Sequence, residues 1–222
     1  MAVRYAVATG NWNTESTWNN GTTLGIPTSG DEVYLNGFNV TVSTTNITCG
    51  TIRNDLFADT GNSGGKLIVS SSSNTTISSN LIAENTIVTL DNNITLTVNG
   101  DITCLHSSGT AAIARSGSAT IVINGNVTSN GGYLYSATGN DSTSITINGN
   151  ITISGGTLLS YATAPTVLLN NGTITLNSAN IINISAIINI NSSVLPQSAI
   201  SRMQNALTVD IFQQILDAHL NN

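Results

Sequence analysis

Apolar and polar residues alternate along most of the chain in short runs, and the runs recur around Asn-Gly pairs. One unit consists of an alternating run, an Asn-Gly pair and a second alternating run. Near copies of it occupy residues 96–103, 121–128 and 145–152, and a looser copy occupies 167–175. Alternation with a period of two predicts β-strands that bury one face. The glycines of the four copies recur at steps of 25, 24 and 23 residues: Gly100, Gly125, Gly149 and Gly172.

Each copy continues through small residues to a third apolar patch, as at 132–135 and 156–159, so one repeat holds three short strands. Asn-Gly between alternating runs is also typical of a two-residue hairpin, which would give an antiparallel meander. A meander gives no reason for a three-strand unit to recur at nearly constant length. Stacked coils require such a unit, because each strand pairs with its counterpart in the coil below.

We therefore predict an all-β fold, a right-handed parallel β-helix (β-solenoid) with coils of about 24 residues. The glycines are expected to supply the positive φ of sharp corners, which Asn tolerates nearly as well. Four residues are expected to stack in one inward column: Val98, Ile123, Ile147 and Leu169.

The pattern predicts three parts: a capping or attachment segment at 1–30, the parallel β-helix at 31–192 and a short α-helical segment at 193–222. Trp12 and Trp18 in the first part are expected to plug the end of the core, and a sugar-stacking site is the alternative. The last part has an apolar stripe at helical spacing, which either caps the final coil or contacts a partner chain. The residues of this oligomer or partner contact are Ile200, Met203, Leu207, Ile211, Phe212, Ile215 and Leu216.

Charge is scarce, which restricts the possible partners. Charged residues make up 7% of the chain and the net charge is −6, whereas ordinary domains have about 25% charged residues. The five bases are scattered, so we expect no nucleic-acid binding. No apolar run is long enough for a membrane span, so we expect no membrane insertion. Stacking accounts for the low charge, because like charges would repel along a ladder while Asn and Thr ladders form hydrogen bonds.

Few residues are suited to catalysis or metal binding. Glu84, Asp91 and Asp101 are not spaced to stack at the coil period, so a catalytic carboxylate pair is not indicated. His106 and His219 lack Cys or acidic neighbours at metal-ligand spacing, and no cofactor or metal is expected. Cys49 and Cys104 are expected to be buried thiols. Tyr133, Tyr135 and Tyr161 recur in successive coils and either stack on host glycans or pack inward or between subunits.

The first 50 residues contain a distinctive series of motifs: Arg4-Tyr5, Gly10-Asn-Trp12, Trp18, Pro27-Thr28-Ser-Gly-Asp31-Glu-Val33 and Thr41-Val42. In these motifs the segment resembles a family of β-helical structural proteins of tailed bacteriophages. It implies a virion component that is non-enzymatic, either a tail fibre or a capsid-decoration (head-fibre) protein. The family motif carries no catalytic residue, and Asp31 is expected to stabilise a turn.

The resemblance and the composition together lead us to expect a virion-located homo-oligomer, a trimer, that also contacts other virion proteins. Two alternatives stay open: a module that binds host glycans, and a tailspike-like enzyme that degrades polysaccharides.

Overall fold

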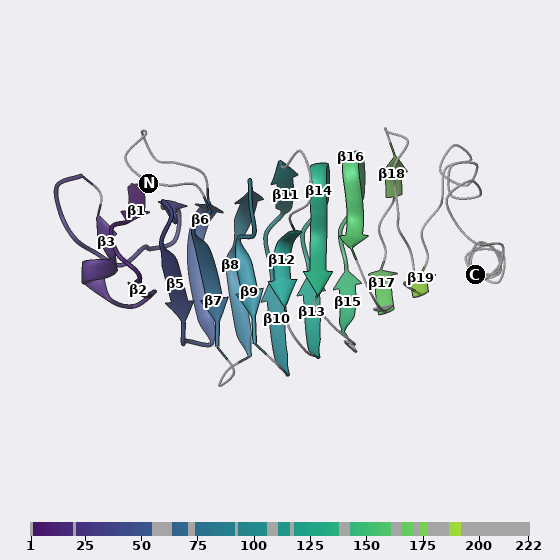
Figure 1. Cartoon of the computed structure of the whole chain (residues 1–222), viewed down its shortest axis with the longest axis horizontal. Coiled ribbons are helices and arrows are strands. Elements are labelled where there is room, and N and C mark those ends of the chain that lie inside the picture. Colours follow the sequence, from purple (N-terminus) through teal and green to yellow (C-terminus); the bar gives the residue numbers. More distant parts are fainter. Residues whose placement is uncertain are drawn as a thin grey trace.

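The structure is a computed structural model of the whole chain. It describes residues 2–19, 21–54, 64–70, 74–91, 93–105, 111–115, 118–137, 143–160, 166–170, 174–176 and 187–191. Nearly all of the regular structure is β, in one sheet that winds along the long axis of the molecule (Figure 1). The expected C-terminal helix lies outside the described residues.

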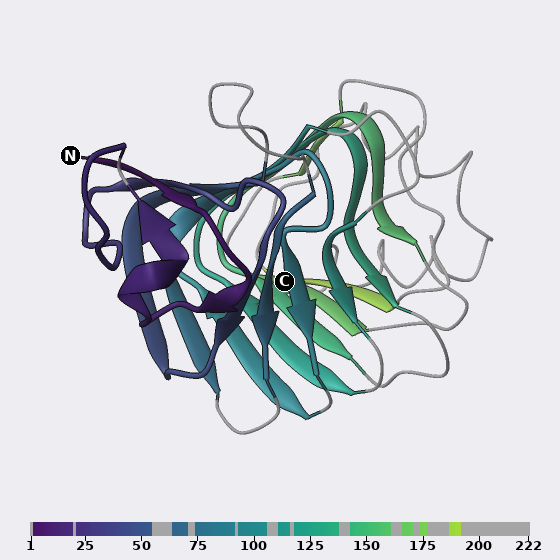
Figure 2. The ribbon, with the colours of Figure 1, turned by 60° about the vertical axis from the view of Figure 1, so that its left-hand side comes forward.

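The strands form three parallel ladders, which we call faces A, B and C in the order in which a coil passes through them (Figure 2). Face A contains β1 (Val3–Ala6), β4 (Glu32–Tyr34), the ends of β6 (Asn46–Arg53) and β8 (Thr75–Ala83), β11 (Ile102–Leu105), the starts of β14 (Val127–Ala137) and β16 (Ile151–Ser160), and β18 (Ile174–Leu176).

Face B contains β2 (Gly10–Asn11), β5 (Asn39–Val42), β7 (Lys66–Val69), β9 (Val88–Leu90), β12 (Ala111–Arg115) and the ends of β14 and β16. Face C contains the starts of β6 and β8, then β10 (Ile94–Val98), β13 (Ala119–Ile123), β15 (Ser144–Ile147), β17 (Thr166–Asn170) and β19 (Ile187–Asn191).

The fold is therefore a parallel β-solenoid, as the sequence predicted. The hairpin alternative is wrong, because β10 pairs in parallel with β8 and β13 while β11 pairs in parallel with β8 and β14. Stacked positions are 30, 21, 25 and 24 residues apart in successive coils. The coil length is thus regular only in the central copies, where the repeat is visible in the sequence.

The expected inward column is present in the register of the strands. Val98 pairs with Ile123, Ile123 with Ile147 and Ile147 with Leu169. The first three side chains are fully buried. Burial of a Val or Ile side chain contributes about 1.5–3 kcal/mol, so a continuous column of them on each face supplies much of the stabilisation.

The N-terminal end of the solenoid is closed by two tryptophans. Trp12 and Trp18 are buried with ring centroids 4.9 Å apart in an edge-to-face arrangement. The indole N–H of Trp18 donates to the carbonyl oxygen of Trp12 at 2.8 Å, so the polar group of the buried ring is satisfied. Both side chains belong to the core, which supports the plug over the sugar-stacking alternative.

The N-terminal segment also takes part in the ladders. β1 pairs in parallel with β4, and β2 pairs in parallel with β5. The antiparallel pairings that the structure describes also lie here, between β1 and β3 (Trp18–Asn19) and between Asn19 and Leu24, beside the 3-10 turn Glu15–Thr17. The cap is therefore continuous with the first coil, and residue 30 marks no break in the pairing.

The role expected for the repeat glycines is wrong in one respect. Asn36 and Gly37 do have positive φ values, 52° and 85°, but Gly100, Gly125 and Gly149 do not. At these three corners the backbones of successive coils nearly touch. A Cβ on Gly125 would overlap the carbonyl oxygen of Gly100, and one on Gly149 would overlap that of Gly125. The absence of a side chain, rather than the backbone conformation, accounts for glycine here.

We predict that Gly125→Ala lowers the free energy of unfolding by about 3 kcal/mol, the upper end of the range for overpacking. The matched control is Gly21→Ala, which meets open space but has φ +93° and should cost about 1–2 kcal/mol through its left-handed backbone alone. Urea denaturation followed by circular dichroism measures both. Equal losses in the two variants would contradict the close-contact explanation.

Candidate functional site

The three acids that the sequence analysis considered for a catalytic pair lie at different corners of the coil. Glu84 follows β8 at the A-to-B corner, Asp91 follows β9 at the B-to-C corner, and Asp101 lies between β10 and β11 at the C-to-A corner. A glycosidase uses two carboxyl groups about 5–10 Å apart on either side of the scissile bond, whereas each of these three acids lies at a different corner of the coil. No cluster of three metal-ligating side chains occurs in the part of the chain that the structure describes.

The candidate tyrosines have different environments. Tyr135 is completely buried, and its hydroxyl lies 3.0 Å from Thr143 Oγ1 in the interior. It cannot stack on a glycan, so of the two alternatives the inward one holds for Tyr135, which pairs in register with the buried Ile113. Tyr133 is half-buried.

The remaining candidates cannot be placed in the fold. Tyr161 and the whole stripe from Ile200 to Leu216 lie outside the described residues, as do both histidines. No helix among the described segments is long and apolar enough to cross a bilayer.

Asp31 is the centre of a buried polar network in the N-terminal cap. Its carboxylate accepts hydrogen bonds from the backbone N–H of Ala2 at 3.0 Å and from the N–H and hydroxyl of Thr28, both at 2.9 Å. Arg4 Nε lies 4.0 Å from the same carboxylate. This network joins β1 to the turn before β4, so Asp31 is a turn-stabilising acid, as the sequence indicated.

The network changes the pKa of Asp31. Burial raises this pKa, but the hydrogen bonds from Thr28 and Ala2 and the charge of Arg4 together lower it below its ordinary value of 3.8. A carboxyl group with a depressed folded-state pKa stabilises the fold above its unfolded-state pKa. That contribution is lost as the pH falls through the folded-state value.

A cluster on face A could not be recognised from the sequence. Tyr5, Tyr34 and Arg53 occupy one outward register position. The Arg53 guanidinium lies 5.5 Å from the centre of the Tyr34 ring and 3.7 Å from the Glu32 carboxylate. The Tyr34 hydroxyl donates to Glu32 at 3.1 Å. The first coils differ in length, so these residues do not recur at a constant spacing.

Both cysteines are buried and free, as expected. Burial raises the pKa of Cys49 to about 11 and that of Cys104 to about 12. Each side chain is therefore a neutral thiol at physiological pH, which fits a packing role and not a nucleophile.

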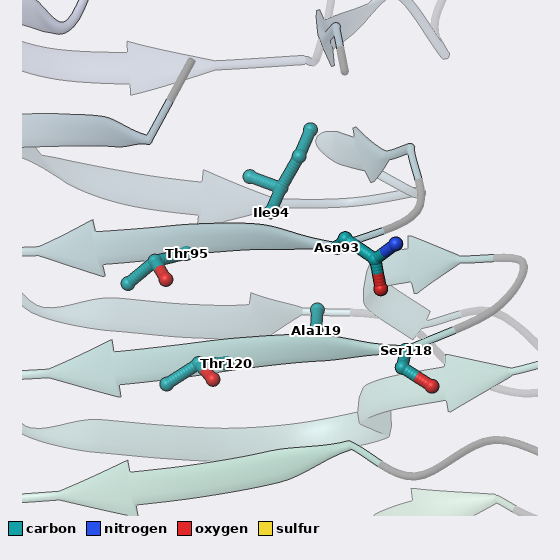
Figure 3. A pocket seen from close by; sticks show the side chains of 6 residues that line it. All are labelled: Asn93, Ile94, Thr95, Ser118, Ala119 and Thr120. Atoms are coloured by element: carbon teal, nitrogen blue, oxygen red, sulfur yellow. The ribbon is translucent and has the colours of Figure 1, made fainter. Parts of the chain in front are cut away.

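Two hollows lie at the edges of face C. One, of about 260 Å³, is lined by Asn93, Ile94, Thr95, Ser118, Ala119 and Thr120. Figure 3 shows Thr95 and Thr120 side by side on adjacent strands, with Asn93 and Ser118 at the corner. The other, of about 290 Å³, lies at the C-to-A corner and is lined by Cys49, Gly50, Ser78, Ser79, Asn80, Asn99 and Gly100. Neither lining contains a charged residue, and sequence analysis missed both hollows.

Side-chain ladders cross the coils at the C-to-A corner. In the first ladder, Asn148 Nδ2 donates to Asn124 Oδ1 at 2.6 Å, Asn124 Nδ2 to Asn99 Oδ1 at 2.8 Å and Asn99 Nδ2 to Ser78 Oγ at 3.0 Å. In the second, the side chain of Asp101 accepts from the backbone N–H of Asn126, and that of Asn126 accepts from the backbone N–H of Asn150. This confirms that Asn side chains stack by hydrogen bonding.

We predict that Asp31→Asn lowers the free energy of unfolding at neutral pH. The free energy of unfolding of this variant should also fall less on acidification than that of the parent protein. An amide cannot reproduce the charge-assisted bonds, and it does not titrate. Urea unfolding at pH 7 and at pH 3 measures both effects, with the exposed Asp91→Asn as control. The stability difference between Asp31→Asn and the parent should shrink at the lower pH, and a constant difference would exclude this role for the carboxylate.

Comparison with known proteins finds no match to this chain among family models, curated proteins or solved structures.

Proposed function

We propose that this protein is a non-enzymatic structural component of a bacteriophage virion, either a tail fibre or a capsid-decoration protein. The observation that carries the proposal is the N-terminal cap. The residues that resemble phage structural proteins form two contacting groups in the N-terminal segment of a parallel solenoid: Trp12 with Trp18, and Arg4 and Thr28 with Asp31. A closed end prevents strand addition at that edge and gives a rigid rod a defined end for attachment.

The positions of three described acids support a structural role over the tailspike-like enzyme. Cleavage of a glycosidic bond needs a proton donor and a second carboxylate close together. Glu84, Asp91 and Asp101 lie at three different corners of the coil, and Asp101 is engaged in a ladder with Asn126.

The proposal is tested by counting the protein in purified particles. Quantitative mass spectrometry of the virions that the encoding phage produces should find the chain in tens of copies for a fibre or in hundreds for a decoration protein. The major capsid protein is the internal standard. Abundance in the infected cell together with absence from purified particles would contradict a virion role.

We also propose that the protein assembles as a trimer through the C-terminal stripe. An apolar stripe from Ile200 to Leu216 is costly to leave in water, and cyclic symmetry closes the contact. Light scattering on the parent protein should give about three times the 22.9 kDa chain mass. The double variant Ile211→Asp, Ile215→Asp should give the mass of a single chain. Gln213→Asp, at a polar position of the same segment, should leave the trimer intact. A single-chain mass for the parent protein at micromolar concentration would exclude a stable trimer.

A further inference from the structure

Face C is an uncharged surface of regularly placed hydroxyl groups. Residues 46–48, 75–78, 94–98, 119–123 and 144–147, which carry this face through five coils, contain no charged residue. Thr95, Thr120 and Ser144 share one outward register position, and Thr97 and Thr146 share the next, with Val122 between them. Adjacent strands lie about 4.8 Å apart, so the hydroxyl groups form rows parallel to the solenoid axis.

One border of this face is the Asn ladder, which keeps hydrogen-bonding capacity for a ligand. A side-chain amide has two N–H donors and an oxygen with two lone pairs. The ladder bonds of Asn99 and Asn124 use one donor and one lone pair of each amide. Among the described contacts, a second donor and a second acceptor site therefore remain on Asn99 and on Asn124, next to the hydroxyl rows.

The two hollows lie on opposite borders of the same face. The hollow at Thr95 and Thr120 offers hydroxyl and amide groups beside the methyl of Ala119 (Figure 3). The hollow at Asn80 and Asn99 offers amides. Ionic side chains lie on the other faces, as with Glu32 and Arg53 on face A and Lys66 on face B.

From these observations we propose that face C, with its two bordering hollows, binds a neutral, extended glycan chain along the solenoid axis. Sugar hydroxyls both donate and accept hydrogen bonds, as the Thr and Asn side chains do. An anionic glycan would find no cation on face C and would meet Asp101 at its border. An extended peptide would need unpaired backbone groups for strand addition, but the backbone of this face is already paired from coil to coil.

The chemistry of the face also determines how affinity depends on ligand length. The described outward positions of face C carry no aromatic ring that could hold a single sugar. Each sugar unit therefore contributes little, and binding requires contacts in several coils at once.

This inference does not depend on a virion role. The protein can be absent from purified virions and still bind glycans, or be present in them and bind none, so the two proposals can fail separately.

The test uses the purified full-length chain with linear neutral oligosaccharides: β-1,4-glucan, β-1,4-mannan and α-1,4-glucan, each of two and of six units. A hexamer of galacturonic acid is the anionic comparison. Isothermal titration calorimetry should show at least one neutral hexamer binding more than tenfold better than its dimer, and better than the acidic hexamer. No binding by any neutral hexamer, or preference for the acidic one, overturns the proposal.

Matched variants assign the binding to face C. Thr120→Arg places a bulky charge in the hydroxyl row, and Thr128→Arg places the same side chain at an outward position of face A in the same coil. We expect at least a tenfold loss of hexamer affinity for the first and none for the second. Asn124→Ala, which removes one ladder amide without adding bulk, should weaken binding severalfold.

Melting temperatures establish whether each variant is folded. If Thr120→Arg does not fold, Asn124→Ala provides the test of binding at face C. Equal loss in Thr120→Arg and Thr128→Arg overturns the assignment to face C. If Thr120→Arg changes the mass of the purified protein in solution but leaves glycan binding unaffected, face C contacts a second copy of the chain. That result would also overturn the proposal.

Discussion

The close approach of successive backbones at the C-to-A corner is the constraint on which the rest of the structure depends. Gly125 lies against the carbonyl of Gly100, and Gly149 against that of Gly125, with no room for a Cβ. Because the Asn-Gly pairs of successive coils stack at this corner, the strands that flank it on faces C and A are held in register. Inward columns such as Val98, Ile123 and Ile147 follow from that register.

Stacking in register also explains the composition. Each outward residue lies above its counterpart one coil below, so a charged residue would face a like charge if the repeat were exact. Asn avoids this, because an amide is both donor and acceptor and can bond to a copy of itself. The one acid in the corner ladders, Asp101, fits because its carboxylate accepts from the backbone N–H and the side-chain amide of Asn126. Its own backbone N–H donates to Asn80 Oδ1.

Much of the fold could be predicted where the coils are regular. The repeat around Gly100, Gly125 and Gly149 gave the three strands per coil and the inward column, because pairing between coils converts a fixed period directly into register. The Trp12–Trp18 plug was foreseen from the changed composition of the first 30 residues, and the turn-stabilising role of Asp31 was expected alongside the resemblance of the N-terminal segment to phage structural proteins. These features depend on local pattern and on burial.

Other features could not be predicted, for identifiable reasons. The Tyr5, Tyr34 and Arg53 column lies in coils of unequal length, so no constant spacing marks it. The register of β14 shifts between Ser129 and Tyr133, so inward and outward positions do not alternate regularly through this strand. The sequence alone therefore does not show whether Tyr135 points inward or outward. The role of the corner glycines was predicted wrongly because Asn-Gly pairs so often form turns with positive φ. The contact that excludes a side chain is made by the backbone of the neighbouring coil, which local sequence does not show.

The direction of the Asn ladder has a consequence for how the chain folds during synthesis. Every described bond of this ladder runs from an amide N–H in a later coil to an oxygen in the earlier one. Each completed coil therefore presents a row of acceptors before its successor has been made. Because the ribosome delivers the capped N-terminal end first and each coil of a solenoid contacts only its neighbours, every new coil has a finished template on which to form.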